Sequence, residues 1–355
     1  MRCIKLFTVA LLFSMTAGRE VRAQTASAWP EADRLFHGDP RWLGADGAFS
    51  IDLGNDRVCW LFGDTWIAQT GATSRRHAWF VHDTVGIEDG YDPTHAAMRF
   101  SWAAKRNGTP TEIFPSEGDT WIWLGSGIRL GGALIVFAER VSPDRTKNSL
   151  GFKSDGWNAY FISNPDSDPS TWRPKKVAEV HDTVVMASAV VRQGSYVYLF
   201  GESEPQHDLY VARVSADSLA KGRFDSLAWW TGREWSSDKT ARQPIIHDAG
   251  TESSVQPDPT GNGFIEVNSQ GFGASEIVLR RALELTGPWS SAQKVYRPPE
   301  SDETDPFVYA GKSHVELRGA DLVLTYATNG FTDAVNDNMA RYFPRFVRVK
   351  LPPHR

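Results

Sequence analysis

The sequence predicts an all-β protein, and three observations support this fold class. Helical hydrophobic periodicity is almost absent from the 355 residues, whereas short β-rich runs recur between Gly, Asp, Asn and Pro. Aromatic residues make up 12% of the chain and include 14 tryptophans, which suits a β-rich protein or one that binds carbohydrate. The third observation is a hairpin that occurs five times.

Each copy of this hairpin has a short strand, a turn with Gly, Asp or Asn, and a second strand of large apolar residues. The copies span residues 48–65, 125–140, 186–203, 253–270 and 313–329. They recur at intervals of roughly 60 to 77 residues, and another strand-like run follows each of them. Five small antiparallel sheets, none able to bury both faces alone, predict a five-bladed β-propeller around a central channel. A β-sandwich is the alternative, but it does not predict five similar hairpins.

The first 23 residues have the features of a secretory signal peptide. Arg2 and Lys5 precede an apolar stretch over residues 6–18 that is too short to span a bilayer, and Val21 and Ala23 fit a cleavage site. We therefore expect residues 1–23 to be a signal peptide and residues 24–355 to form a single propeller domain. The protein is then expected to be periplasmic or secreted.

Charge and cysteine content exclude several classes of function. The formal net charge is −5, and removal of the first 23 residues, which carry +3, leaves −8. A negative chain argues against nucleic acid and against an anionic membrane surface as partners. Cys59 would be the only cysteine left, which excludes an internal disulfide and a cysteine metal cluster. We expect no metal, no cofactor and a monomer.

Polar side chains end the second strand of the hairpins at matched positions. Asp64, Glu139 and Glu202 end three of these strands, and Asn268 and Asn329 lie in the equivalent zone of the other two. A buried unpaired charge is costly, so an apolar strand should not end in a carboxylate without a use. Five such ends around one axis predict a ring of polar groups that binds a ligand.

Asp46 precedes the first strand of the first hairpin, and Asp64 ends its second strand. The turn between these strands should bring the two carboxylates face to face, whereas Asp52 and Asp56 should face solvent. Paired carboxylates in different environments are the usual equipment for glycoside hydrolysis. Trp66 follows Asp64 with the same strand parity and is expected to stack on a sugar.

The last unit combines Lys312, His314 and Glu316 before a strand that ends at Asn329. We expect His314 and Asn329 to bind sugar hydroxyls, although a structural role for the histidine is equally compatible with the sequence. No spacing of His, Asp and Glu matches a zinc motif, and no Gly-x-Ser-x-Gly element supports esterase chemistry.

Taken together, these elements resemble a known family. The resemblance rests on Phe62-Gly-Asp64-Thr-Trp66 after Asp46, on Gly287-Pro-Trp289, on Lys312-Ser-His314-Val-Glu316-Leu, on Thr325-Tyr-Ala-Thr-Asn329 and on Tyr342-Phe-Pro-Arg345-Phe-Val-Arg. The ordered set resembles bacterial five-bladed propeller hydrolases, formerly a domain of unknown function, that are associated with endo-D-arabinanase activity. The resemblance implies two catalytic aspartates at the channel mouth, which correspond to Asp46 and Asp64. That family often has Pro between the His and Glu, where this chain has Val315.

The function predicted from the sequence is a secreted glycoside hydrolase that cleaves furanoside linkages, with D-arabinan of a bacterial envelope polysaccharide as the substrate that the resemblance implies. Asp46 and Asp64 form the expected catalytic pair. The expected substrate-binding residues are Trp66, Glu139, Glu202, Asn268, His314 and Asn329. A non-catalytic carbohydrate-binding propeller is the alternative, and a structural or protein-binding propeller is a third possibility.

Overall fold

The structure is a computed structural model that describes residues 25–69, 74–146, 150–225, 227–271, 275–330 and 333–351. The expected signal peptide over residues 1–23 lies outside these residues. Strands dominate the described part of the chain, where the longest helix has only five residues. The all-β prediction is confirmed.

Five sheets of four or five strands account for most of the molecule. The first contains β3 (Phe49–Gly54), β4 (Arg57–Phe62), β7 (Thr84–Asp89) and β8 (Ala97–Ser101). The second contains β11 (Trp121–Leu130), β12 (Ala133–Pro143), β13 (Phe152–Ile162) and β14 (Lys175–Val180). The third contains β15 (Val184–Gln193), β16 (Tyr196–Ser203), β17 (Leu209–Ser215), β18 (Ala228–Trp230) and β19 (Trp235–Ser236).

The fourth sheet contains β20 (Ser253–Pro257), β21 (Phe264–Gln270), β22 (Glu276–Ala282) and β23 (Gln293–Tyr296). The fifth contains β24 (Pro306–Ser313), β25 (Leu322–Gly330), β26 (Arg345–Lys350) and β1 (Thr25–Ala28). Neighbouring strands in all five sheets are antiparallel. The fifth sheet therefore joins the two ends of the described chain, because β1 pairs with β26.

Smaller elements lie between these strands. Two minor sheets contain β2 (Trp42–Ala45), β5 (Thr65–Ile67) and β6 (Trp79–Val81), and β9 (Ala103–Ala104) with β10 (Pro110–Thr111). The helical pieces are α1 (Pro30–Asp33), α2 (Ala216–Ala220), η1 (Arg34–His37), η2 (Arg75–His77), η3 (Pro169–Thr171), η4 (Lys239–Ala241), η5 (Pro299–Asp302) and η6 (Asp333–Asn336). In the part of the chain described, no helix is both long enough and apolar enough to cross a membrane.

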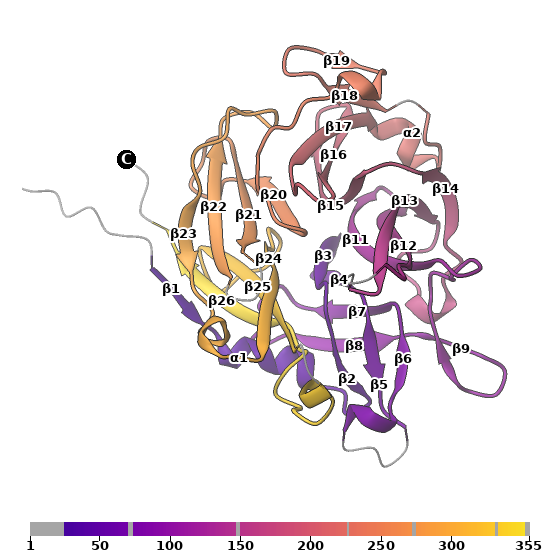
Figure 1. Ribbon diagram of the computed structural model, residues 1–355. Coiled ribbons are helices and arrows are strands. Elements are labelled where there is room, and N and C mark those ends of the chain that lie inside the picture. Colours follow the sequence, from indigo (N-terminus) through magenta and orange to yellow (C-terminus); the bar gives the residue numbers. More distant parts are fainter. Residues whose placement is uncertain are drawn as a thin grey trace, which may run out of the picture.

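One edge strand of each large sheet lies near the centre of the molecule, and the other strands of that sheet lie further out (Figure 1). These inner strands are β3, β11, β15, β20 and β24. Strand β3 packs against β11, β11 against β15, β15 against β20, and β20 against β24. Lys312 of β24 donates to the carbonyl oxygen of Gly47, just before β3. The start of the first sheet and the inner strand of the fifth are thus in contact.

Apolar side chains fill the space between successive sheets. One cluster joins Ile51 and Leu61 of the first sheet to Leu124 and Val136 of the second. Equivalent clusters lie between each following pair, and one that includes Trp60 and Phe346 joins the first sheet to the fifth. Burial of this apolar surface stabilises the arrangement, and it leaves the ends of the inner strands as the place where polar groups meet.

Candidate functional site

The two predicted catalytic aspartates lie near each other at one end of the first hairpin. Strands β3 and β4 pair Phe49 with Leu61, and β2 and β5 pair Ala45 with Thr65. Asp46 and Asp64 lie between these two ladders and interact electrostatically, and Gly63 N–H donates to the carbonyl oxygen of Asp46 at 3.1 Å. Gly63 is needed here, because a Cβ on it would lie 2.7 Å from Asp46 Oδ1.

Two tyrosines hold the carboxyl group of Asp46. The hydroxyl groups of Tyr309 and Tyr342 donate to Oδ2 at 2.8 and 3.2 Å. Burial raises the pKa of Asp46 to about 8, and the negative charges of Asp64 and Glu252 act in the same direction. Asp46 nevertheless keeps part of its surface accessible. It is therefore suited to carry a proton at neutral pH and to donate it.

Asp64 has a different environment although it lies nearby. Its Oδ1 accepts a hydrogen bond from Trp123 Nε1 at 2.8 Å and lies 2.8 Å from His82 Nδ1. Its side chain is 19% exposed. A carboxyl group in this setting is suited to act as a base or a nucleophile.

Glu252 is a third carboxylate of this site, and the sequence analysis missed it. It immediately precedes β20, pairs with Lys312 Nζ at 2.5 Å, and is partly exposed. Its negative charge raises the pKa of Asp46, of Glu139 and of Glu202. In a hairpin, the residue before the first strand and the residue at the end of the second strand lie at the same end. A search of the positions before the first strands, in addition to the ends of the second strands, could therefore have found Glu252.

Glu139 and Glu202 lie in the same electrostatic environment. Burial raises the pKa of Glu139 to about 8, with contributions from Glu204 and Glu252. Glu202 is 5% exposed and accepts a hydrogen bond from Ser253 Oγ at 2.7 Å, and burial raises its pKa well above the ordinary value. Neither residue is paired with a cation that would cancel this effect among the described interactions.

Asn268 and His314 lie inside the sheets with their hydrogen-bonding groups in use. Asn268 accepts from Arg280 Nη1 at 2.8 Å and donates to the carbonyl oxygen of Ser269 at 3.0 Å. The ring nitrogens of His314 lie 2.6 Å from Ser50 Oγ and 2.7 Å from Thr325 Oγ1. These contacts match the structural role that the sequence left open for His314.

Asn329 and Trp66 are both partly exposed. The side chain of Asn329 accepts a hydrogen bond from the N–H of Gly330 at 2.8 Å. Trp66 packs against Phe80, with 4.8 Å between the ring centroids. Of the predicted substrate-binding residues, Trp66 is the nearest to Asp64 along the chain. Its side chain is also partly accessible.

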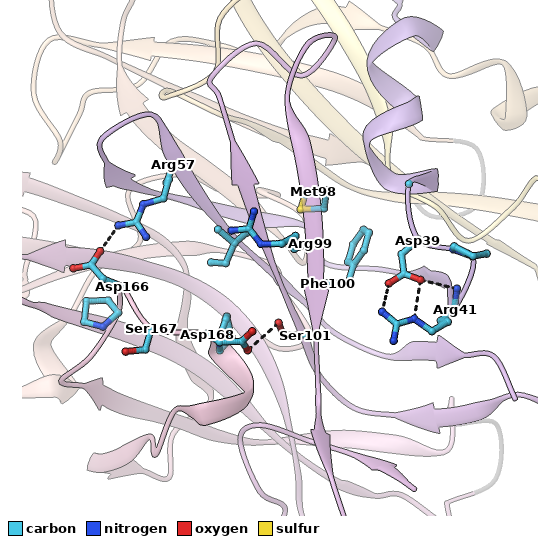
Figure 2. Close-up of a pocket in the computed structure, with 15 residues that line it drawn as sticks. Asp39, Arg41, Arg57, Met98, Arg99, Phe100, Ser101, Asp166, Ser167 and Asp168 are labelled. Carbon is cyan, nitrogen blue, oxygen red and sulfur yellow. Dashed lines mark hydrogen bonds and ion pairs between the residues drawn. The ribbon is translucent and has the colours of Figure 1, made fainter. Parts of the chain in front are cut away.

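Two further polar regions differ from this site. A hollow of about 450 Å³ borders β8 and residues 165–169 (Figure 2), and none of the candidate carboxylates lines it. Its arginines have carboxylate partners in Asp39, Asp89 and Asp166. Because these charges are neutralised in pairs, the hollow offers little to a charged ligand.

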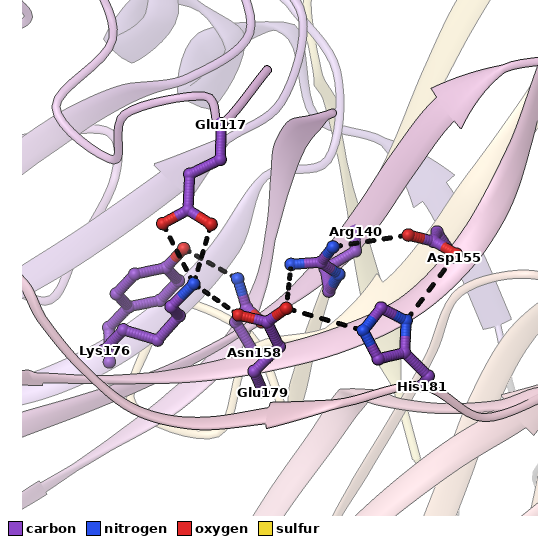
Figure 3. Close-up of polar contacts among 8 residues, drawn as sticks. Glu117, Arg140, Asp155, Asn158, Lys176, Glu179 and His181 are labelled. Atoms are coloured by element: carbon purple, nitrogen blue, oxygen red, sulfur yellow. Dashed lines mark hydrogen bonds and ion pairs between the residues drawn. The ribbon is translucent and has the colours of Figure 1, made fainter. Parts of the chain in front are cut away.

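The second polar region lies on the sheet that contains Glu139. Arg140, the next residue along β12, pairs with Asp155 at 3.3 Å and with Glu179 at 3.0 Å. Figure 3 shows the wider network, which contains Glu117, Asn158, Lys176 and His181. The network supports strands β12 to β14 behind Glu139. Within the described ranges, no group of three or more His, Cys, Asp or Glu residues is placed to hold a metal ion.

Comparison with known proteins identifies a family and a shared fold. A family model described as "Domain of unknown function (DUF5005)" matches residues 31–351. No curated protein sequence matches the chain. A protein of Bacteroides ovatus ATCC 8483, for which a hydrolase activity has been suggested, is 16% identical with a TM-score of 0.76, over 94% of this chain and 93% of that chain.

A xylan β-1,4-xylosidase of Bacillus halodurans C-125 is 10% identical with a TM-score of 0.50, over 88% of this chain and 53% of the xylosidase. The chain thus spans about half the length of that enzyme. At such identities the likeness shows the fold, which is that of the β-propeller glycoside hydrolases, and not the substrate.

Proposed function

The chain belongs to the family described as a domain of unknown function (DUF5005), and we propose that it is a secreted glycoside hydrolase that cleaves furanoside linkages. The proposed substrate is D-arabinan of a bacterial envelope polysaccharide. We further propose that the five large sheets are the blades of one propeller, and that the protein acts as a monomer without a metal or cofactor. Secretion rests on the signal-peptide features of residues 1–23.

The observation that carries this proposal is the juxtaposition of Asp46 and Asp64 in different environments. Asp46 is partly buried, receives hydrogen bonds from two tyrosines and has a pKa raised to about 8. Asp64 is partly exposed, accepts a hydrogen bond from Trp123 and lies 2.8 Å from His82 Nδ1. A protonated carboxyl beside an ionised one is the pairing that cleavage of a glycosidic bond requires.

In this reaction Asp46 donates its proton to the glycosidic oxygen as the bond between that oxygen and the anomeric carbon breaks. Asp64 either removes a proton from the attacking water or attacks the anomeric carbon itself and is released by water. Both routes consume one water and produce one new reducing end. Glu252 supports the first step, because its negative charge helps to keep the proton on Asp46.

The choice of a furanoside substrate depends on the family resemblance seen in the sequence, and hydrolysis depends on the carboxylates. These two parts can be tested separately. The full chain is incubated with arabinogalactan that contains D-arabinan, with linear L-arabinan and with xylan, and new reducing ends and product sizes are measured. We expect release from the D-arabinan substrate only.

Release from xylan or L-arabinan alone would reject the proposed substrate and keep the proposed reaction. Stable binding with no product after long incubation would favour the non-catalytic carbohydrate-binding propeller. Asp52→Asn is the control for substitutions of Asp46 and Asp64. Asp52 lies on the same hairpin and is exposed, and it accepts a hydrogen bond from the Tyr91 hydroxyl. This variant should retain the full activity.

A further inference from the structure

A continuous row of rings passes beside Asp64 and spans two sheets. Neighbouring members follow one another at centroid distances of 4.7 to 6.3 Å. We call this row the aromatic strip, and it consists in order of Trp66, Phe80, His82, Trp121, Trp123 and Phe152. The strip joins β5 and β6, which extend the first hairpin, to β11 and β13 of the second sheet.

The strip is attached directly to the proposed catalytic centre. His82 and Trp123, which belong to it, both contact Oδ1 of Asp64 at 2.8 Å. A molecule bound at Asp64 would therefore lie beside rings of the strip.

Every member of the strip keeps accessible surface. Phe80 is 43% exposed and is among the most exposed large apolar side chains of the described residues. The other five members are partly exposed. Partly exposed aromatic rings of this kind offer apolar faces, which suit the C–H faces of sugars.

We propose that the aromatic strip binds a polysaccharide chain that passes Asp64 over the minor sheet of β2, β5 and β6 and over the second sheet. This inference rests on the proposed function for the identity of the site, and it adds that the substrate is a chain that occupies several sugar positions along the strip. The occupant that we infer is a saccharide chain, because two members of the strip, His82 and Trp123, contact the carboxyl group of Asp64 directly.

The structure provides a matched control for this proposal on strand β6. Trp79 is adjacent to Phe80 and is 40% exposed, but alternation along the strand directs it to the opposite face. Phe80 pairs with Trp66 across the ladder, whereas Trp79 pairs with Ile67. Phe80→Ala and Trp79→Ala therefore remove similar exposed area from the two faces of one strand.

The test measures binding separately from hydrolysis. The full chain with Asp46→Asn is run in native gels that contain soluble D-arabinan arabinogalactan, L-arabinan or xylan, alone and combined with Phe80→Ala, Trp66→Ala or Trp79→Ala. We expect Phe80→Ala and Trp66→Ala each to weaken retardation by roughly 3- to 10-fold in apparent affinity. Trp79→Ala should leave the affinity unchanged, and melting temperatures should confirm that all variants are folded.

Equal retardation of Phe80→Ala and Trp79→Ala, or no retardation by any of the three polysaccharides, would overturn the proposal. A concentration-dependent dimer in gel filtration that Phe80→Ala abolishes would also overturn it, because the strip would then be an interface between copies. If strip variants lose binding but the unmodified protein releases no product, the strip stands and the proposed hydrolase function fails. If the protein hydrolyses and the strip variants bind normally, only the strip fails.

Discussion

Two groups of polar residues among the apolar strands of this protein differ in whether a cation is bound to their carboxyl groups. At the mouth of the first hairpin, Asp46 and Asp64 are close in space and both keep accessible surface. Inside the fourth sheet, Arg280 binds both Glu266 and Asn268 at 2.8 Å, and all three side chains are buried. The first group accumulates negative charge, whereas the second neutralises it.

This difference separates a reactive group from a structural one. Arg280 offsets part of the cost of burying the Glu266 carboxyl group, although burial still raises the pKa of Glu266 to about 7. At the hairpin mouth, the negative charges of Asp64 and Glu252 instead raise the pKa of Asp46. Function is expected to follow this division.

The largest effect is expected from the aspartate pair itself. Asp46→Asn removes the proposed proton donor and Asp64→Asn the proposed base or nucleophile, so each should lower kcat by about 10²- to 10⁴-fold. Initial rates of reducing-end release from D-arabinan measure this loss, and circular dichroism shows that the fold is retained. Full activity in either folded variant would remove that aspartate from the mechanism.

A smaller effect is expected from Glu252, which touches the pair only through its charge. Glu252→Gln removes a negative charge that raises the pKa of Asp46, so Asp46 should lose its proton at a lower pH. We expect activity to fall several-fold at pH 8 and to change little at pH 5.5. An equal loss at both pH values would instead indicate direct contact between Glu252 and the substrate.

The pH profile of the unmodified protein tests the role of Asp46 directly. A general acid works only while protonated, and burial raises the pKa of Asp46 to about 8. Activity should therefore be maintained below that pH and decline as the pH rises through about 8. Tyr309 donates to Asp46 and lowers its pKa, so Tyr309→Phe should move the alkaline decline to higher pH.

Opposite shifts in Glu252→Gln and Tyr309→Phe would identify Asp46 as the titrating group. Glu139 also has a pKa raised to about 8, but the hydrogen bond of Tyr309 is to Asp46. A decline that neither variant moves would assign the proton donor to another carboxyl group.

The sequence predicted the all-β fold and the meeting of Asp46 with Asp64, because both follow from short-range patterns. Strand alternation and a turn suffice to bring the ends of one hairpin together. Glu252 and Tyr309 were missed because they reach Asp46 only through the packing of the fourth and fifth sheets beside the first. The pairing of β1 with β26 was missed for the same reason, since it joins the two ends of the chain.

His314 should give the smallest effect on activity and a distinct effect on stability. Its ring is 2% exposed and contacts Ser50 and Thr325. The variant His314→Leu leaves two buried hydroxyl groups without these contacts and should therefore cost about 1 to 3 kcal/mol of unfolding free energy.

Burial lowers the pKa of His314 well below 6.5, so the folded ring stays neutral while the unfolded ring gains a proton below about pH 6.5. The unmodified protein therefore loses stability from this group as the pH falls, and its advantage over His314→Leu in urea unfolding should shrink between pH 7.5 and pH 5.5. An unchanged kcat in the folded variant would place His314 with the structural group, whereas a rise in KM with no loss of stability would place it with the substrate-binding residues.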